Sequence, residues 1–268
     1  MKKQSLLIAL IITLTILSSS HTYAQLGGLL QRAKDKVAQR AGEMMDGKKS
    51  SKTETTTSNR RHSVTTVFDF TSGDSLIFAE DFSTVPVGAS VKSLKTNGAA
   101  TVATVEDQSG KWLLMEQSAT YRLTKQRFYP KHFTVEFDIV VAADKVGDVY
   151  PVVFGFTNDN STKGYISQDG GHVTVQYYNN DKVAVSNNHG KYLTTDFDLT
   201  PYNNRPMHVS MMVDGERFAL YLDKAKIADT EFFLPTDTKN LYISAPTQYS
   251  NGAKVLIGNL RIAGFKKI

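Results

Sequence analysis

The stretch that decides the fold is Phe133-Thr-Val-Glu-Phe-Asp-Ile-Val-Val141, in which apolar side chains alternate with Thr, Glu and Asp. A period of two places alternate side chains on opposite faces of a strand, so one face is apolar and the other largely polar. The same rhythm returns over Met207–Val213 and Phe218–Leu222, with Asp214-Gly215 between them as a hairpin signal. The pattern predicts antiparallel strands around a shared apolar core.

Strand patterns continue to the C-terminal end of the sequence. Strict alternation over Val255–Ile262 places Val255 and Ile257 on one face and Leu260 and Ile262 on the other. No amphipathic stretch of helical length follows residue 66, and Asn-Gly and Asp-Gly turns separate the strands. Residues 67–268 form a segment that is longer than a seven-stranded immunoglobulin-like domain. They predict an all-β domain, a two-sheet antiparallel jelly-roll sandwich.

The first residues have the layout of a secretory signal peptide. Lys2 and Lys3 precede the apolar run Leu6–Leu17, and Thr22-Tyr-Ala24 supplies a small-residue cleavage site. The run is too short for a bilayer, which needs about 20 apolar residues. We predict a signal peptide over 1–24 and an exported protein, in the periplasm, at the outer membrane or secreted. An uncleaved signal anchor is the alternative.

Two further segments precede the strands. Residues 25–46 carry Leu, Ala, Val and Met at three- and four-residue steps, which predicts a short amphipathic helix. Such a helix is marginal alone, so we expect it to self-associate, to lie on a membrane surface or to bind a partner protein, unless it is merely a frayed leader. Residues 47–66 are almost entirely polar and predict a flexible linker.

Charge is concentrated in these front segments. Residues 25–66 hold nine Lys/Arg and four Asp/Glu, a balance of +5, whereas residues 67–268 hold 20 against 22, a balance of −2. A nucleic-acid-binding domain clusters basic residues on its folded face, so no nucleic-acid partner is expected. The absence of cysteine excludes disulfides, thiolate metal sites and cysteine nucleophiles.

At this point several stretches resemble a known family. Phe133–Val141, His208–Asp223 and Ile257–Gly264 resemble the core strand, hairpin and closing strand of concanavalin A-like (laminin G-like) lectin domains. Phe68–Phe82, together with the basic leader, resembles the N-terminal sandwich of bacterial envelope proteins of the outer-membrane protein A family. Their peptidoglycan-binding domain is absent from this sequence, so peptidoglycan binding is not carried over.

The same fold includes laminarinase-like glycoside hydrolases, which the chain resembles in part of one motif. Their E-x-D-x-x-E strand is matched by Glu136 and Asp138, but the third position is Val141. Retaining hydrolysis needs two carboxylates, one as nucleophile and one as acid. No H-E-x-x-H, G-x-S-x-G or phosphate-binding glycine motif occurs either. We therefore predict a non-catalytic protein.

Aromatic and amide side chains near turns are the candidate ligand-binding residues. Sugars bind on aromatic rings flanked by hydrogen-bonding side chains. Aromatic and amide residues are neighbours in the sequence at the end of one predicted strand and again just before Pro206. The predicted residues are Tyr177, Tyr178, Asn179, Asn180, Tyr202 and Asn203. The alternative is purely structural, because Tyr favours strands and Asn favours turns.

Calcium is the one cofactor that the sequence suggests. Laminin G-like domains often hold it on rim loops, and Asn158, Asp159 and Asn160 offer hard oxygen ligands on a polar loop. Asp196 and Asp198 are a weaker candidate pair, because they alternate with apolar residues as a strand edge does. Neither set has the spacing of an EF-hand loop.

These observations predict a non-catalytic, exported binding module of the bacterial cell envelope, with a glycan or an envelope protein as its partner. Two alternatives stay open. One is a glycan-processing hydrolase with an unrecognised site. The other is a structural envelope protein that associates through residues 25–46.

Overall fold

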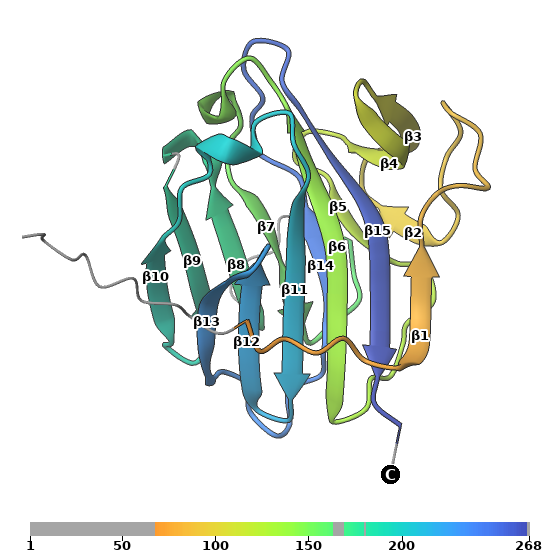
Figure 1. The fold of residues 1–268 in the computed structure, drawn as a ribbon. Coiled ribbons are helices and arrows are strands. Elements are labelled where there is room, and N and C mark those ends of the chain that lie inside the picture. The colour runs from red at the N-terminus through yellow and green to blue at the C-terminus, as the bar shows by residue number, and fades with distance from the viewer. Residues whose placement is uncertain (1–67, 163–168, 180, 267–268) are drawn as a thin grey trace, which may run out of the picture. The chain divides into compact units, whose positions relative to one another are not determined.

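The computed structural model describes residues 68–162, 169–179 and 181–266. These residues form two antiparallel sheets stacked face to face (Figure 1), which confirms the predicted all-β sandwich. The predicted signal peptide (1–24), helix (25–46) and linker (47–66) lie outside them. No helix in the described ranges is long and apolar enough to cross a membrane.

One sheet has eight strands and the other seven. The 8-stranded sheet runs β13 (Ala225–Glu231), β12 (Arg217–Leu222), β11 (Met207–Asp214), β6 (His132–Ala142), β15 (Lys254–Gly264), β4 (Gln108–Met115) and β3 (Ala100–Val105), with β1 (Ser75–Glu80) also paired to β15. The 7-stranded sheet runs β10 (Tyr192–Asp196), β9 (Lys182–Asn187), β8 (Gly171–Gln176), β7 (Val152–Thr157), β14 (Asn240–Ser244), β5 (Thr120–Leu123) and β2 (Leu94–Thr96).

The core lies between the two sheets, and β6 supplies its centre. Alternate β6 side chains are buried there, as its sequence predicted: Phe133, Val135, Phe137, Ile139 and Val141. The predicted hairpin is also confirmed, since β11 and β12 pair directly up to Asp214 and Arg217. Gly215 in its turn has a φ of 62°, a conformation that glycine adopts without strain.

The second half of β15 departs from the predicted alternation. Val255 and Ile257 are buried in the core, but so are Leu260 and Ile262, which strict alternation placed on the other face. The register against β6 shifts between Gly258 and Arg261, as in a β-bulge. Asn259 sits in the bulge with a φ of 53°. The extra residue reverses which side chains of β15 face the core. The prediction of strict alternation is therefore wrong beyond Gly258.

A small apolar cluster lies on the outer face of the 8-stranded sheet. Trp112, Val140 and Leu256 are buried there, away from the main core. Gly258 permits this packing, because a Cβ at that position would lie 2.7 Å from the Trp112 ring. Val140, the apolar residue on the polar side of β6, thus has a packing role.

A strap of chain, residues 68–74, crosses the outer face of the 8-stranded sheet before it enters β1 (Figure 1). Near its start the Tyr221 hydroxyl donates a hydrogen bond to Asp69 at 2.8 Å. Farther along, Arg261 donates to the Ser72 hydroxyl at 2.7 Å. The strap explains why Tyr221, on an outer face, is fully buried.

The sandwich has two ends, named here by β6. At the upper end, where β6 finishes, lie three short 3-10 turns: η1 (Val146–Asp148), η2 (Tyr177–Asn179) and η3 (Thr200–Tyr202). At the lower end, where β6 begins, lie the β11–β12 turn and the connections 124–131 and 232–239. In Figure 1 the upper end is at the top. Both ends carry surface depressions.

Candidate functional site

The upper end collects most of the residues predicted to bind a ligand. Tyr177, Tyr178 and Asn179 form η2, Tyr202 ends η3, and Asn203 follows it. η1 and η2 lie against each other. Asn180 lies outside the described residues. Segments distant in sequence therefore meet around η1.

Tyr178 is one of two exposed aromatic residues that stack on each other at this end. Its ring stacks on that of Tyr150 with centroids 5.4 Å apart and planes only 16° from parallel. The two side chains are 47% and 38% exposed. Tyr150 comes from the segment between η1 and β7, so η1 and η2 together position the pair. We call Tyr150 and Tyr178 the tyrosine platform.

Tyr177 has a different role from the predicted one. It is fully buried, and burial raises the pKa of its hydroxyl well above the usual value. Tyr177 is the first residue of η2 and its ring enters the core, whereas the next residue of the turn, Tyr178, faces solvent. A buried ring offers no surface to a ligand. Tyr177 therefore supports the platform from below, and its prediction as a contact residue is wrong.

Tyr202 ends η3, and Asn203 follows it beside η1. The Tyr202 ring stacks on Phe197 at 5.6 Å, and the Arg205 guanidinium lies 5.3 Å from its centroid. Burial, followed by a hydrogen bond with Asp223, raises the pKa of Tyr202 to about 12. Its hydroxyl is therefore neutral near pH 7 and can donate a hydrogen bond.

A polar hollow of about 510 Å³ adjoins η1. It is lined by Asp144, Lys145, Val146, Gly147, Asp148, Thr200 and Asn203. Asp148 is held rigidly, because its carboxylate accepts hydrogen bonds from the Asn251 amide at 2.8 Å and from the Lys145 backbone at 3.3 Å. η1 lines the hollow and also contacts η2, and Tyr150 follows η1 by two residues, so the platform lies near the hollow's polar groups.

The sequence did not identify all of this site. Tyr150 carried no signal, because a tyrosine before a strand is unremarkable until its stacking partner is known. No motif singled out residues 144–148 either. Their convergence with η2 and η3 depends on long-range topology, which local patterns do not encode.

The calcium prediction does not fit the loop that carries it. The Asn158 side-chain oxygen accepts from the Thr238 backbone, and an Asp159 carboxylate oxygen accepts from Ser161. The Asp159 carbonyl accepts from the buried Arg122, whose guanidinium also faces the carboxylate at 3.8 Å. Arg122 thus holds a permanent positive charge beside Asp159, which disfavours a second cation there. Asn160 donates its side-chain amide to the Leu123 carbonyl at 3.3 Å. No cluster of three or more His, Cys, Asp or Glu in metal-binding geometry occurs within the described ranges.

The other predicted metal pair is also engaged. Asp196 faces Lys182 at 3.9 Å, and Asp198 accepts a hydrogen bond from the Thr200 backbone at 2.9 Å. These contacts are those of a strand edge and a turn. The pair therefore gives calcium no better site than the Asn158–Asn160 loop.

Glu136 and Asp138, the two residues of the hydrolase-like motif, lie on the outer face of β6. His208 bridges them, with Nδ1 at 2.6 Å from Asp138 and Nε2 at 3.6 Å from Glu136. Arg261 pairs with Glu136 at 3.1 Å, and Asn259 donates to Asp138 at 2.6 Å. Both carboxylates are thus neutralised by fixed protein groups.

This arrangement differs from that of a hydrolase, in which two carboxylates are free to act on the substrate. Burial opposes ionisation of Glu136, but hydrogen bonds from His208 and Ser72 outweigh it and lower its pKa. A lowered pKa is the opposite of what a general acid needs. Val141 faces the main core, and the next residue on the outer face is the apolar Val140. Glu136, Asp138, His208 and Arg261 form an ion network that links β6, β11 and β15.

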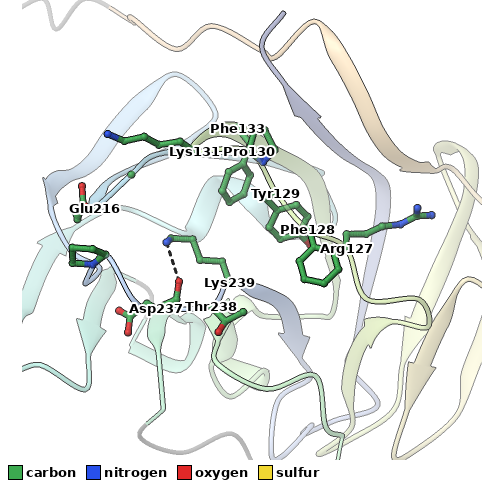
Figure 2. Close-up of a pocket in the computed structure, with 12 residues that line it drawn as sticks. Arg127, Phe128, Tyr129, Pro130, Lys131, Phe133, Glu216, Asp237, Thr238 and Lys239 are labelled. Atoms are coloured by element: carbon green, nitrogen blue, oxygen red, sulfur yellow. Dashed lines mark hydrogen bonds between the residues drawn. The ribbon is translucent and has the colours of Figure 1, made fainter. Parts of the chain in front are cut away.

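A second cavity, of about 440 Å³, opens at the lower end (Figure 2). It lies between the connection 127–131, the β11–β12 turn and the connection 235–239. Lys239 projects among the lining residues, with aromatic rings to one side and Glu216 to the other. The sequence had not pointed to this cavity.

Comparison with known proteins supports the fold and little more. No family model matches the chain, and no curated protein matches it. These searches therefore give no support to the likeness to envelope proteins of the outer-membrane protein A family.

Solved structures with the same architecture include lectin domains. The exoplasmic/lumenal domain of VIP36 in its metal-free form has a TM-score of 0.51 and 15% identity, over 68% of this chain and 90% of that one. Arcelin-5, a lectin-like defense protein from Phaseolus vulgaris, has a TM-score of 0.50 and 12% identity, over 69% and 96%. The concanavalin A-like lectin fold predicted from the strand motifs is thereby confirmed.

A sialidase also matches part of the fold. Its TM-score is 0.50 with 13% identity, and the match covers 72% of this chain. The chain spans only 19% of the sialidase, so the likeness concerns one region of a larger protein.

Proposed function

We propose that this protein is a non-catalytic glycan-binding module, and that the tyrosine platform and the adjoining polar hollow form its binding surface. The observation that carries the proposal is the exposed, nearly parallel pair of Tyr150 and Tyr178 beside that hollow. The apolar face of a sugar ring packs on an aromatic ring, while its hydroxyls need donors and acceptors nearby. Asp144, Thr200 and Asn203 would supply them.

The fold comparison agrees with this proposal. The VIP36 domain has been solved in a Ca²⁺/Man2-bound form, at a TM-score of 0.51 and 13% identity to this chain. Fold likeness alone does not transfer a ligand, so the sugar class must be found by experiment. The proposal departs from that neighbour in one respect, since binding here is taken to be calcium-independent.

Export belongs to the same proposal. The charged, apolar and small-residue segments of 1–24 are the basis for placing the protein outside the cytoplasm. An exported module that binds glycan fits the predicted tether, which would let the sandwich reach surfaces around its attachment point. An envelope protein as partner, through residues 25–46, remains the alternative.

Affinity electrophoresis of the full chain in gels containing different polysaccharides tests the binding proposal. We expect at least one polysaccharide to retard the wild type, and Tyr178→Ala to abolish the retardation. Tyr192→Ala is the matched control, because Tyr192 is a 66% exposed tyrosine that does not line the hollow. Chelator should leave retardation unchanged. The proposal would be refuted if Tyr178→Ala and the wild type were retarded equally, or if no polysaccharide retarded the wild type.

A further inference from the structure

The lower-end cavity holds a lysine whose hydrogen bonds are incomplete. Lys239 is partly buried, and its ammonium donates one long bond of 3.3 Å to the Asp237 carbonyl. The group lies 4.7 Å from the centroid of the Phe233 ring. An ammonium has three donors, so two are left for a ligand. No carboxylate lies within ion-pair distance of Lys239 in the described ranges.

The charged neighbours of Lys239 do not satisfy it. The Asp237 carboxylate accepts from the Leu234 backbone at 2.8 Å and faces His189 at 3.1 Å, so it is already engaged. The Asp237 carboxylate, and then that of Glu216, attract Lys239 only at longer range. Arg127 and Lys131 add positive charge to the lining. The cavity therefore has an excess of positive charge over free carboxylate.

An exposed aromatic ring lies at the same cavity. Phe128 is 87% exposed, more than any other large apolar side chain in the described ranges. It is carried on the connection between β5 and β6, which also supplies Tyr129 and Pro130 to the lining. A ligand that covers this ring removes apolar surface from water, which favours binding. The cavity thus offers a ring surface together with a cation that has no ion-pair partner among the described residues.

We propose that this cavity binds an acidic sugar, a uronate residue, with Lys239 paired to its carboxylate and Phe128 packed against its ring. The volume of about 440 Å³ accommodates one sugar residue with its neighbours partly outside. The assignment rests on the proposed function only in taking the ligand to be a glycan. It adds a second site, at the opposite end from the tyrosine platform, and a charge requirement.

Isothermal titration of the full chain with tri-galacturonate and tri-glucuronate tests the assignment. The methyl esters of the same trisaccharides keep the backbone and lose the charge. We expect at least one free acid to bind and its ester to bind at least tenfold more weakly, because a hydrogen bond to a charged group contributes about that much. Failure of both acids to bind, or equal binding of acid and ester, would overturn the proposal.

Variants locate the site. Lys239→Met keeps the apolar stem against Phe233 and removes the charge, so affinity for the acid should fall at least about tenfold, whereas Lys239→Arg should retain binding. Phe128→Ser should weaken both acid and ester, and at 87% exposure it cannot unfold the domain. Lys224→Met is the matched control and should bind normally, because Lys224 is an exposed lysine of the β12–β13 turn that lines neither proposed site. Undiminished acid binding by Lys239→Met would contradict the assignment.

The two proposals can fail separately. Tyr178→Ala should not affect the uronate titration, and Lys239→Met should not affect retardation by a neutral polysaccharide. Burial lowers the pKa of Lys239. The positive charge is lost as pH rises through that lowered pKa, so acid binding should weaken at a more acidic pH in the wild type than in Lys239→Arg. Identical pH profiles would count against Lys239 as the counter-ion.

Discussion

The two neighbouring tyrosines of η2 have different roles, because Tyr177 packs in the core and Tyr178 is proposed to contact the glycan. Tyr177 is fully buried, whereas Tyr178 is 47% exposed and stacked on Tyr150. Replacing Tyr177 by alanine would open a core cavity, at about 3–5 kcal/mol for an aromatic residue. Replacing Tyr178 removes a half-exposed ring and costs far less. Tyr178→Ala therefore reports on binding without the loss of fold that confounds Tyr177→Ala.

His208 makes stability depend on pH. The hydrogen bond that His208 donates to Asp138, and then the one that it donates to Glu136, raise the pKa of His208 to about 9 from its ordinary value of 6.5. A raised pKa in the folded state means that the charged form stabilises the fold. The stabilisation is fully present below the unfolded pKa of 6.5 and is lost as pH rises through about 9.

We predict that His208→Gln destabilises the protein by about 1 kcal/mol near pH 6, a value kept small because the side chain is partly exposed. The difference from wild type should shrink towards about pH 10, where His208 is neutral in both states. Urea unfolding at a series of pH values measures it. In an Asp138→Asn background the pH dependence should be weaker, and a difference that stays constant across the range would argue against this ion network.

At the scale of an element, the bulge in β15 aligns two stretches of one strand with the same core. Asn259 adopts a φ of 53° there, which lets Ile257 and Leu260 both face inward. Its side chain also donates to Asp138 at 2.6 Å, which ties the bulge to β6. Without the extra residue, the second half of β15 would turn its apolar side chains to the outer face.

We predict that Asn259→Ala is less stable than Asn259→Gly by about 1 kcal/mol, because a Cβ is unfavourable in the left-handed region. Both variants lose the same side-chain hydrogen bond, so their difference isolates the backbone conformation. In an ordinary strand the order is reversed, since glycine costs about 0.5–1 kcal/mol relative to alanine. Ser186 in β9 serves as the control position. Urea midpoints showing alanine as the more stable residue at 259 would contradict the bulge.

The strand β15 also shows what hydrophobic patterns in the sequence cannot predict. Hydrophobic alternation located β6, β11 and β12, because a strand with one buried face must repeat every two residues. In β15 the pattern Ile257-Gly-Asn-Leu260 is compatible with either a regular strand or a bulge. Only pairing with β6 on one side and β4 and β1 on the other decides between them.

Across the whole molecule, the sandwich was predictable and the site only partly so. The two-sheet architecture follows from strand period and length, which are local properties. The upper site needs Tyr150, η2 and η3 to meet, and chain topology fixes that meeting. Tyr178 was predicted because aromatic and amide residues adjoin in sequence, but its partner Tyr150 was not. Lys239 and Phe128 lie far apart in the chain and gave no joint signal.

The two ends of the sandwich divide the proposed binding between a neutral and an acidic part of a glycan. The tyrosine platform offers ring surface beside a polar hollow, while the lower cavity offers a cation beside an exposed phenylalanine. A module with sites at both ends could hold two segments of polysaccharide at once and gain avidity. The central claim is nevertheless the upper site, on which the proposed function depends.

Hydrogen–deuterium exchange of the full chain, with and without a polysaccharide that retards it, tests that claim most directly. The account predicts slower exchange at backbone amides of 144–150 and 177–179 when the polysaccharide is present, and no such slowing in Tyr178→Ala. Slowed exchange confined to the outer faces of the sheets, with residues 144–150 and 177–179 unchanged, would contradict it.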